Sequence, residues 1–132
     1  MASSRASRPQ DVVLWTLAIL SVGAVAGLSL VPDPPTGGTG LSDKVLHGIG
    51  YSVVTFLLLL AAVWAPWGGR KPLPRSPWVV AATIVSLGAG IELVQTLVPN
   101  RTPEIFDVVA NLVGVAGGSA LWARLRLGGR TA

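Results

Sequence analysis

Residues 42–51 read SDKVLHGIGY and begin a long apolar segment. They contain the only histidine and the only tyrosine of the chain. Because residues four apart lie on the same face of an α-helix, Asp43, His47 and Tyr51 are expected to form one stripe, with Lys44 beside it. The sequence therefore predicts a polar stripe on a helix that enters a membrane.

Lys44 conflicts with the local preferences of a helix. A cation in the first turn opposes the positive end of the helix dipole, and such conflicts are typical of functional positions. The alternative interpretation is that Ser42 caps the helix while Asp43 and Lys44 simply lie in the headgroup region.

The composition points to a membrane protein. The chain has 132 residues, of which 51% are hydrophobic and only 12% are charged, which is too apolar for an ordinary soluble domain. The net charge of +4 comes from basic residues in short clusters beside apolar segments, so we expect no nucleic-acid partner. The chain has no cysteine, which excludes thiol chemistry, and we expect no cofactor.

Four apolar segments are long enough to cross a bilayer, and proline- and glycine-rich loops separate them. The first segment has an alternative interpretation as a signal peptide, since Ala24-Val25-Ala26 resembles a cleavage site, but apolar sequence continues to Val31. The sequence thus predicts an all-α membrane protein with a four-transmembrane-helix bundle. We expect helices over residues 12–31, 42–65, 78–98 and 103–125.

The fourth helix has a well-formed predicted start. Thr102 is expected as its N-cap and Pro103 as its first residue, and we interpret Glu104 as a structural acid favoured by the helix dipole. Within this helix Gly114 and Gly118 are expected to form a packing contact with another helix.

A second glycine pair leaves two interpretations open. Gly23 and Gly27 in the first segment either allow another helix to approach or reflect the frequent glycine of membrane helices. At the level of domains we expect a disordered cytoplasmic N-terminus over 1–10, a membrane domain over 11–126 and a cytoplasmic tail over 127–132.

The distribution of charge and tryptophan predicts the orientation. If both termini are cytoplasmic, eight of the ten basic residues lie inside, and only Lys44 and Arg101 lie outside. The five tryptophans then fall near the inner ends of the helices, as an interfacial belt requires. We therefore expect a multi-pass protein of the inner (plasma) membrane with both termini in the cytoplasm.

Under this topology three separate segments supply one polar cluster near the outer face. Glu92 lies six residues before Val98, which at 1.5 Å per residue is about 9 Å below the helix end. A carboxyl group at that depth should be protonated or paired with Lys44, His47 or Arg101, and Gln95 is placed to orient it. The nine members of the cluster are Asp43, Lys44, His47, Tyr51, Glu92, Gln95, Arg101, Asp107 and Asn111.

These residues also follow an ordered pattern along the chain. It reads Asp43-Lys44-x-x-His47-x-x-x-Tyr51, then Glu92-x-x-Gln95, then Arg101 after a proline, then Asp107-x-x-x-Asn111-x-x-Gly114. In this the chain resembles the VanZ-like family of small bacterial membrane proteins over about residues 42–118. The resemblance implies a multi-helix inner-membrane protein. The founding member of that family is associated with low-level resistance to the glycopeptide teicoplanin, and the resemblance supplies no settled reaction.

The cluster suggests a function at the cell envelope. Our leading hypothesis is a protein that binds or modifies an anionic lipid or lipid-linked headgroup at the outer leaflet, and whether the cluster is catalytic stays open. The candidates for proton transfer are His47, Glu92 and Asp107. The candidates for substrate binding are Asp43, Lys44, Tyr51, Gln95, Arg101 and Asn111.

Two alternative functions remain beside this hypothesis. The first is a non-enzymatic helper whose polar cluster locks the fold or docks an envelope protein partner. A proton-coupled transporter ranks last, because the inner half of the spans offers only uncharged serine and threonine. His47, Glu92 and Asp107 are also residue types that form a three-ligand metal set, but ligand spacing across three helices cannot be derived from sequence, so we assign no metal site.

The predicted orientation can be tested directly. A reporter that is active only in the cytoplasm, fused after Ala132, should be active, and the same reporter placed between the first two helices should not be. A fusion after Ala132 that proves extracellular would contradict the predicted topology and the outer position of the cluster.

Overall fold

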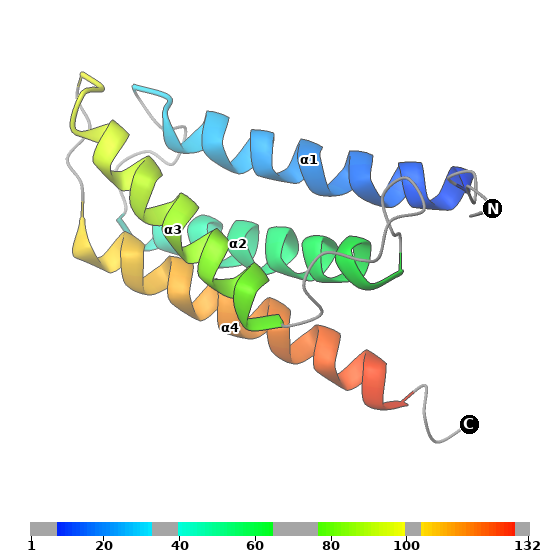
Figure 1. The fold of residues 1–132 in the computed structure, drawn as a ribbon. Helices are drawn as coiled ribbons and strands as arrows, with labels where there is room; N and C mark the ends of the chain where they lie inside the picture. Colours follow the sequence, from blue (N-terminus) through cyan, green and yellow to red (C-terminus); the bar gives the residue numbers. More distant parts are fainter. Residues whose placement is uncertain (1–7, 33–39, 65–76, 100–103, 129–132) are drawn as a thin grey trace.

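A computed structural model describes residues 8–32, 40–64, 77–99 and 104–128. Within these ranges the regular secondary structure consists of four α-helices, each long and apolar enough to cross a membrane (Figure 1). The predicted all-α fold with four membrane-spanning helices is therefore confirmed. The helices are α1 (Pro9–Ser29), α2 (Gly40–Trp64), α3 (Pro77–Gln95) and α4 (Ile105–Gly128).

The beginnings of three helices differ from the prediction by two or three residues. α1 begins at Pro9 because proline suits the first helical position and the carboxylate of Asp11 accepts a hydrogen bond from the backbone N–H of Arg8 at 3.2 Å. α2 begins at Gly40 rather than Ser42. α4 begins at Ile105, and the carbonyl oxygen of Glu104 accepts the backbone N–H of Asp107 at 2.9 Å. The predicted N-cap, Thr102, and the predicted first helical residue, Pro103, lie outside the described residues.

The end of α3 shows how proline limits a helix. The α-helix stops at Gln95, three residues before the predicted end at Val98. The chain then tightens into turns in which the N–H groups of Leu97 and Val98 bond to carbonyl oxygens three residues back, at 2.9 and 3.0 Å. Pro99 disfavours the α conformation of the residue before it, so the helix cannot continue through Val98.

The helices alternate in direction, which gives the bundle two distinct ends. The N-terminal end of α1 and the C-terminal end of α4 lie at the same end of the molecule (Figure 1). The starts of α2 and α4 and the ends of α1 and α3 lie at the opposite end (Figure 1). The described segments that were predicted to carry the polar cluster therefore meet at one end of the bundle.

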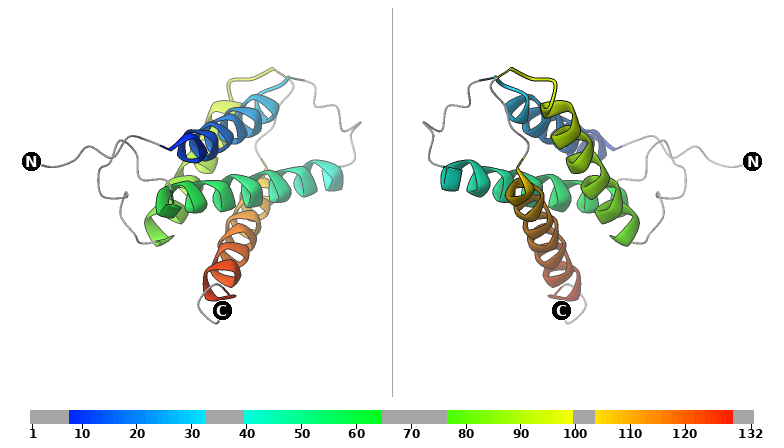
Figure 2. Two further views of the ribbon diagram at one scale, coloured as in Figure 1. Left: turned by 90° about the vertical axis from the view of Figure 1, so that its right-hand side faces the viewer. Right: turned by 90° about the vertical axis from the view of Figure 1, so that its left-hand side faces the viewer.

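α2 is the central element of the packing. It contacts each of the other three helices, most extensively α4, which crosses it at a large angle (Figure 2). A buried cluster joins Tyr51 and Val54 of α2 to Ile84 of α3 and Val115 of α4. Because lipid tails are as apolar as these side chains, this association depends on close packing and polar contacts rather than on the hydrophobic effect.

Two glycines of α4 allow the close approach to α2. A Cβ atom on Gly114 would overlap the carbonyl oxygen of Gly48 and lie 2.9 Å from Tyr51 Cβ. A Cβ atom on Gly118 would overlap the carbonyl oxygen of Ser52. The predicted packing role of Gly114 and Gly118 is therefore confirmed.

The other glycine pair has a different environment. A Cβ atom on Gly23 or on Gly27 would meet nothing within 4 Å in the described part of the chain. Within the described residues no other helix approaches either glycine. Of the two interpretations, the structure of this chain therefore supports the second, which is the general abundance of glycine in membrane helices.

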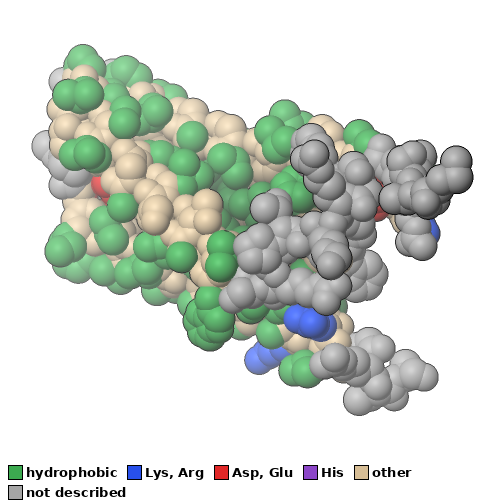
Figure 3. Space-filling model, in the orientation of Figure 1, with side chains coloured by type: hydrophobic (Ala, Val, Ile, Leu, Met, Phe, Trp, Pro, Cys, Tyr) green, Lys and Arg blue, Asp and Glu red, His purple; other side chains and the backbone are tan. Residues whose placement is uncertain are grey.

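The outer surface of the bundle suits contact with lipid. Figure 3 shows that hydrophobic side chains cover much of the face in view. Large apolar side chains are exposed on several helices, among them Leu20, Leu93 and Val113. In water such a surface would favour aggregation, whereas in a bilayer it is the expected boundary with acyl chains.

We expect Gly114→Ala to destabilise the protein by about 1–3 kcal/mol, because the added methyl group would push α4 away from α2. Gly23→Ala is the matched control, since its methyl group would meet open space. The measurement is the free energy of unfolding in detergent micelles. Equal stability of the two variants would contradict a close contact at Gly114.

Candidate functional site

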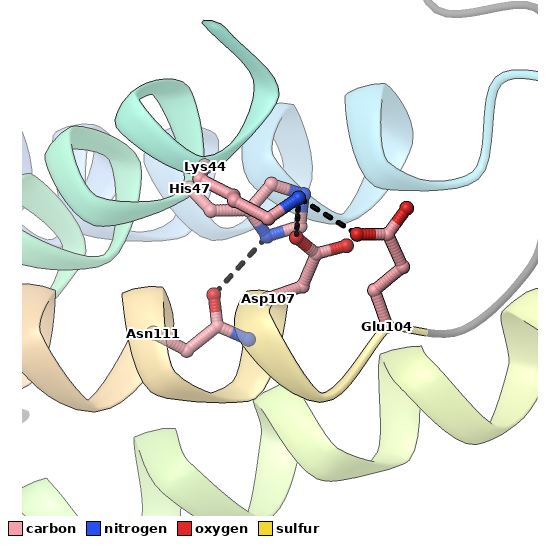
Figure 4. A network of polar contacts seen from close by, with 5 residues as sticks. All are labelled: Lys44, His47, Glu104, Asp107 and Asn111. Carbon is pink, nitrogen blue, oxygen red and sulfur yellow. Dashed lines mark hydrogen bonds and ion pairs between the residues drawn. The ribbon is translucent and has the colours of Figure 1, made fainter. Parts of the chain in front are cut away.

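Lys44 joins the start of α2 to the start of α4 (Figure 4). Its Nζ lies 2.7 Å from Glu104 Oε2 and 3.7 Å from Asp107 Oδ1. The Glu104 side chain is 48% exposed and the Asp107 side chain only 5%, with Lys44 between them at 24%. Because α2 begins at Gly40, Lys44 lies in the second turn, where the unfavourable dipole effect has weakened.

His47 lies one turn deeper and makes the second link between the same helices. Its Nδ1 is 3.1 Å from Asn111 Oδ1, and both side chains are buried (Figure 4). Whether Nδ1 donates or accepts in this contact depends on the tautomer of the imidazole. The contact with Asn111 holds the position of the ring between the two helices.

Tyr51 continues the stripe one further turn into the bundle. Its ring is stacked on the His47 ring, with a centroid distance of 6.3 Å and an interplanar angle of 12°. The side chain is buried, and its hydroxyl has no hydrogen-bond partner among the described residues. A Cβ atom on Gly88 of α3 would lie 3.1 Å from this hydroxyl and 3.3 Å from Asn111 Nδ2. Gly88 thus lets α3 pack directly against the polar stripe.

α3 contributes two buried polar side chains on the face that contains Gly88. Glu92 lies one turn from Gly88 and is buried inside the bundle. Gln95 is also buried, and its Nε2 donates a hydrogen bond to the carbonyl oxygen of Ser29 at 2.7 Å. We expected Gln95 to orient Glu92, but this bond instead joins the end of α3 to the end of α1.

The structure brings most of the predicted cluster together at one end of the bundle. α2 and α4 supply Lys44, His47, Tyr51, Asp107 and Asn111 in direct contact, and Glu92 and Gln95 are buried on the neighbouring face of α3. The side chain of Asp43 and the whole of Arg101 lie outside the described residues.

The prediction from sequence missed the role of two residues of the site and assigned a different role to a third. Glu104 was assigned a structural role at the start of a helix, yet its carboxylate binds Lys44. The carbonyl group of Ser29 has no signature in sequence as an acceptor for Gln95. The role of Gly88 was predictable from sequence. It lies one helical turn from the polar Glu92, just as Gly114 lies one turn from the polar Asn111, and a small residue beside a polar one marks a face where another helix packs.

The three-ligand metal set has no support in the described residues. No group of three or more His, Cys, Asp or Glu side chains within them is arranged to hold a metal ion.

A comparison with models of known protein families identifies the family of this chain. The family model described as VanZ/LLP1 matches residues 29–126, which is well over half of the sequence. The chain belongs to the VanZ/LLP1 family. No curated protein and no solved structure matches the chain. The match begins at the last residue of α1, so the part common to the family is α2 to α4 together with their connections, and these helices carry the polar stripe.

The arrangement of this VanZ/LLP1 protein combines an exchangeable cation with a fixed imidazole. An ammonium group near the surface can exchange its carboxylate partner for an incoming anion, because exposed ion pairs are weak. The imidazole one turn deeper is held by a buried hydrogen bond, so it would keep its position during such an exchange.

We expect the His47–Asn111 contact to appear as an energetic coupling between the two helices. In a double-mutant cycle with His47→Leu and Asn111→Leu, the two single changes should together cost more than the double change, by about 0.5–1.5 kcal/mol. The reason is that each single change leaves one buried polar group without its partner.

The measurement is the free energy of unfolding in detergent micelles. Thr83→Val provides the control cycle with His47→Leu, since the exposed Thr83 hydroxyl donates only to Val79 of its own helix, at 2.9 Å. Strict additivity of His47→Leu and Asn111→Leu would contradict the interhelical bond.

Proposed function

We propose that this VanZ/LLP1 membrane protein binds an anionic lipid or lipid-linked headgroup at the outer leaflet of the plasma membrane. The observation that carries the proposal is the partly exposed Lys44, which lies at the end of the bundle beside a buried imidazole. Arg101, the second basic residue assigned to this side by the charge distribution, would share the phosphate or carboxylate of the ligand.

The two partners of Lys44 support exchange with a ligand. The contact with the half-exposed Glu104 belongs to a class of ion pairs worth only about 0–1 kcal/mol, so a headgroup phosphate can replace this carboxylate. The buried Asp107 keeps the ammonium group near the end of the bundle during the exchange. Lys44 is thereby held in place for an anion that approaches from the headgroup region.

A chemical step on the bound headgroup is the second part of the proposal. His47 lies one turn below Lys44 on the same face of α2, with its position held by the contact with Asn111. It would exchange a proton with the ligand, assisted by Glu92 or Asp107, as a general acid or base. A role in glycopeptide susceptibility rests on the family alone, and a comparison of teicoplanin susceptibility in cells with and without the protein would test it.

A different observation favours a second candidate function. Three polar contacts each join two helices, as expected for a polar cluster that only stabilises the fold. These contacts are His47–Asn111, Lys44–Asp107 and Gln95–Ser29. In that case the protein is a non-enzymatic helper that docks or stabilises an envelope protein. Variants at His47 would then lose stability without a separate loss of ligand binding or turnover.

We expect Lys44→Met to weaken binding of phosphatidylglycerol about tenfold, because a charge-assisted hydrogen bond is lost while the side chain keeps its length. The measurement is a lipid titration of the detergent-solubilised protein by native mass spectrometry.

Arg126→Met serves as the matched control for this change, since Arg126 lies over the Trp122 ring at the opposite end of the bundle. Unchanged lipid affinity of a folded Lys44→Met variant would overturn the proposed function.

A further inference from the structure

We infer that the headgroup bound by Lys44 carries an ammonium group beside its anionic group, as phosphoethanolamine does. The inference rests on the proposed function and specifies that the phosphate or carboxylate of its ligand is accompanied by an ammonium group. Two features of the described residues carry it, namely the charge around Lys44 and the aromatic ring beside it.

Among the described residues, the charge around Lys44 suits a zwitterion better than a simple anion. Within 4 Å of its single ammonium group lie two carboxyl groups, those of Glu104 and Asp107, so when both are ionised these three groups together carry a charge of −1. Asp107 is buried and cannot turn away into solvent, whereas the half-exposed Glu104 can. A phosphate that replaces Glu104 at Lys44 therefore still lies near the carboxylate of Asp107, and it adds a negative charge close to the displaced carboxylate of Glu104.

A cation on the ligand offsets part of this repulsion. If the headgroup carries an ammonium group next to its phosphate, the phosphate binds Lys44 and the ammonium group binds the displaced Glu104. The original ion pair between Lys44 and Glu104 is then replaced by two ion pairs, while the carboxylate of Asp107 stays beside Lys44 as before. Charge-assisted hydrogen bonds of this kind are stronger than neutral ones, so the exchange is favourable for a zwitterion.

Phe106 provides a second contact for the same ammonium group. The residue is 63% exposed, and its ring centroid lies 6.0 Å from Lys44 Nζ, within the range of a cation–π interaction. Phe106 lies two residues after Glu104 at the start of α4. The ring and the carboxylate are thus two groups at the end of the bundle that attract a cation. Because a carboxylate needs N–H donors, a primary ammonium group fits better than a quaternary one.

The test compares phosphatidylethanolamine with phosphatidylglycerol of the same acyl chains, titrated by native mass spectrometry. Glu104→Gln should weaken binding of phosphatidylethanolamine about three- to tenfold and should strengthen binding of phosphatidylglycerol, because it removes a partner of the ammonium group and a competitor of the phosphate. Phe106→Leu should weaken binding of phosphatidylethanolamine only. Asp11→Asn, which removes a charge at the opposite end of the bundle, should change neither lipid.

Further arms separate the possible outcomes. Soluble phosphoethanolamine that competes with the lipid would identify the headgroup alone as the ligand, and failure to compete would assign part of the recognition to the acyl chains. Equal binding of phosphatidylcholine would overturn the preference for a primary ammonium group.

If Glu104→Gln strengthens binding of both lipids equally, the zwitterion inference fails while the proposed function stands. If Lys44→Met changes neither lipid, the proposed function fails with it.

Discussion

The structure depends on the inability of hydrocarbon to solvate ionic and strongly polar side chains. A carboxylate, an ammonium group or an amide inside a bilayer is stable only when another protein group replaces the lost water. In this chain α2 and α4 satisfy that condition for each other, through the ion pair of Lys44 with Asp107 and the hydrogen bond of His47 with Asn111. Residues more than sixty positions apart are thereby held in contact, and α3 completes the enclosure.

The exposed fraction of the side chains falls from the end of the bundle inward along the polar cluster of α2 and α4. This fall separates side chains whose partners can change from side chains whose positions are fixed. Glu104 and Lys44 lie near the end of the bundle, where water and lipid headgroups compete for their charges. Asp107, His47 and Asn111 are buried, where a broken bond is costly and the geometry is therefore fixed. The polar cluster thus has side chains near the end of the bundle that can change partners and buried side chains that stay in place. Ligand exchange requires this arrangement.

Much of this site was predictable because membrane sequences restrict the possible positions of polar residues. Helical spacing placed His47 and Tyr51 on one face and Asp107, Asn111 and Gly114 on another, and the alternation of four spans brought those faces to the same end. The individual pairings were not predictable. Whether Lys44 binds Glu92 or Asp107 depends on the rotation and crossing of the helices, and spacing along the chain does not determine either quantity.

The same limit explains the two assignments that changed. Glu104 was expected to interact with the dipole of its own helix, but its long side chain also reaches Lys44 of α2. Gln95 was expected to orient Glu92 within α3, but its amide reaches the terminal carbonyl group of α1. In both cases a local interaction was assumed where a contact with another helix formed, because the unsatisfied groups at helix ends are available as partners.

Close packing and polar pairing are not separate features of this bundle, because they lie on one face of α4. Asp107, Asn111, Gly114 and Gly118 are all buried there, with the polar pair toward the end of the bundle and the glycines deeper inside. The glycines set the distance between the α2 and α4 backbones, and Gly114 is one turn from Asn111. Any side chain at Gly114 would move α4 away from α2 and lengthen the His47–Asn111 bond. The small residues are therefore the condition under which the polar residues can meet, and the face as a whole acts as the unit that builds the site.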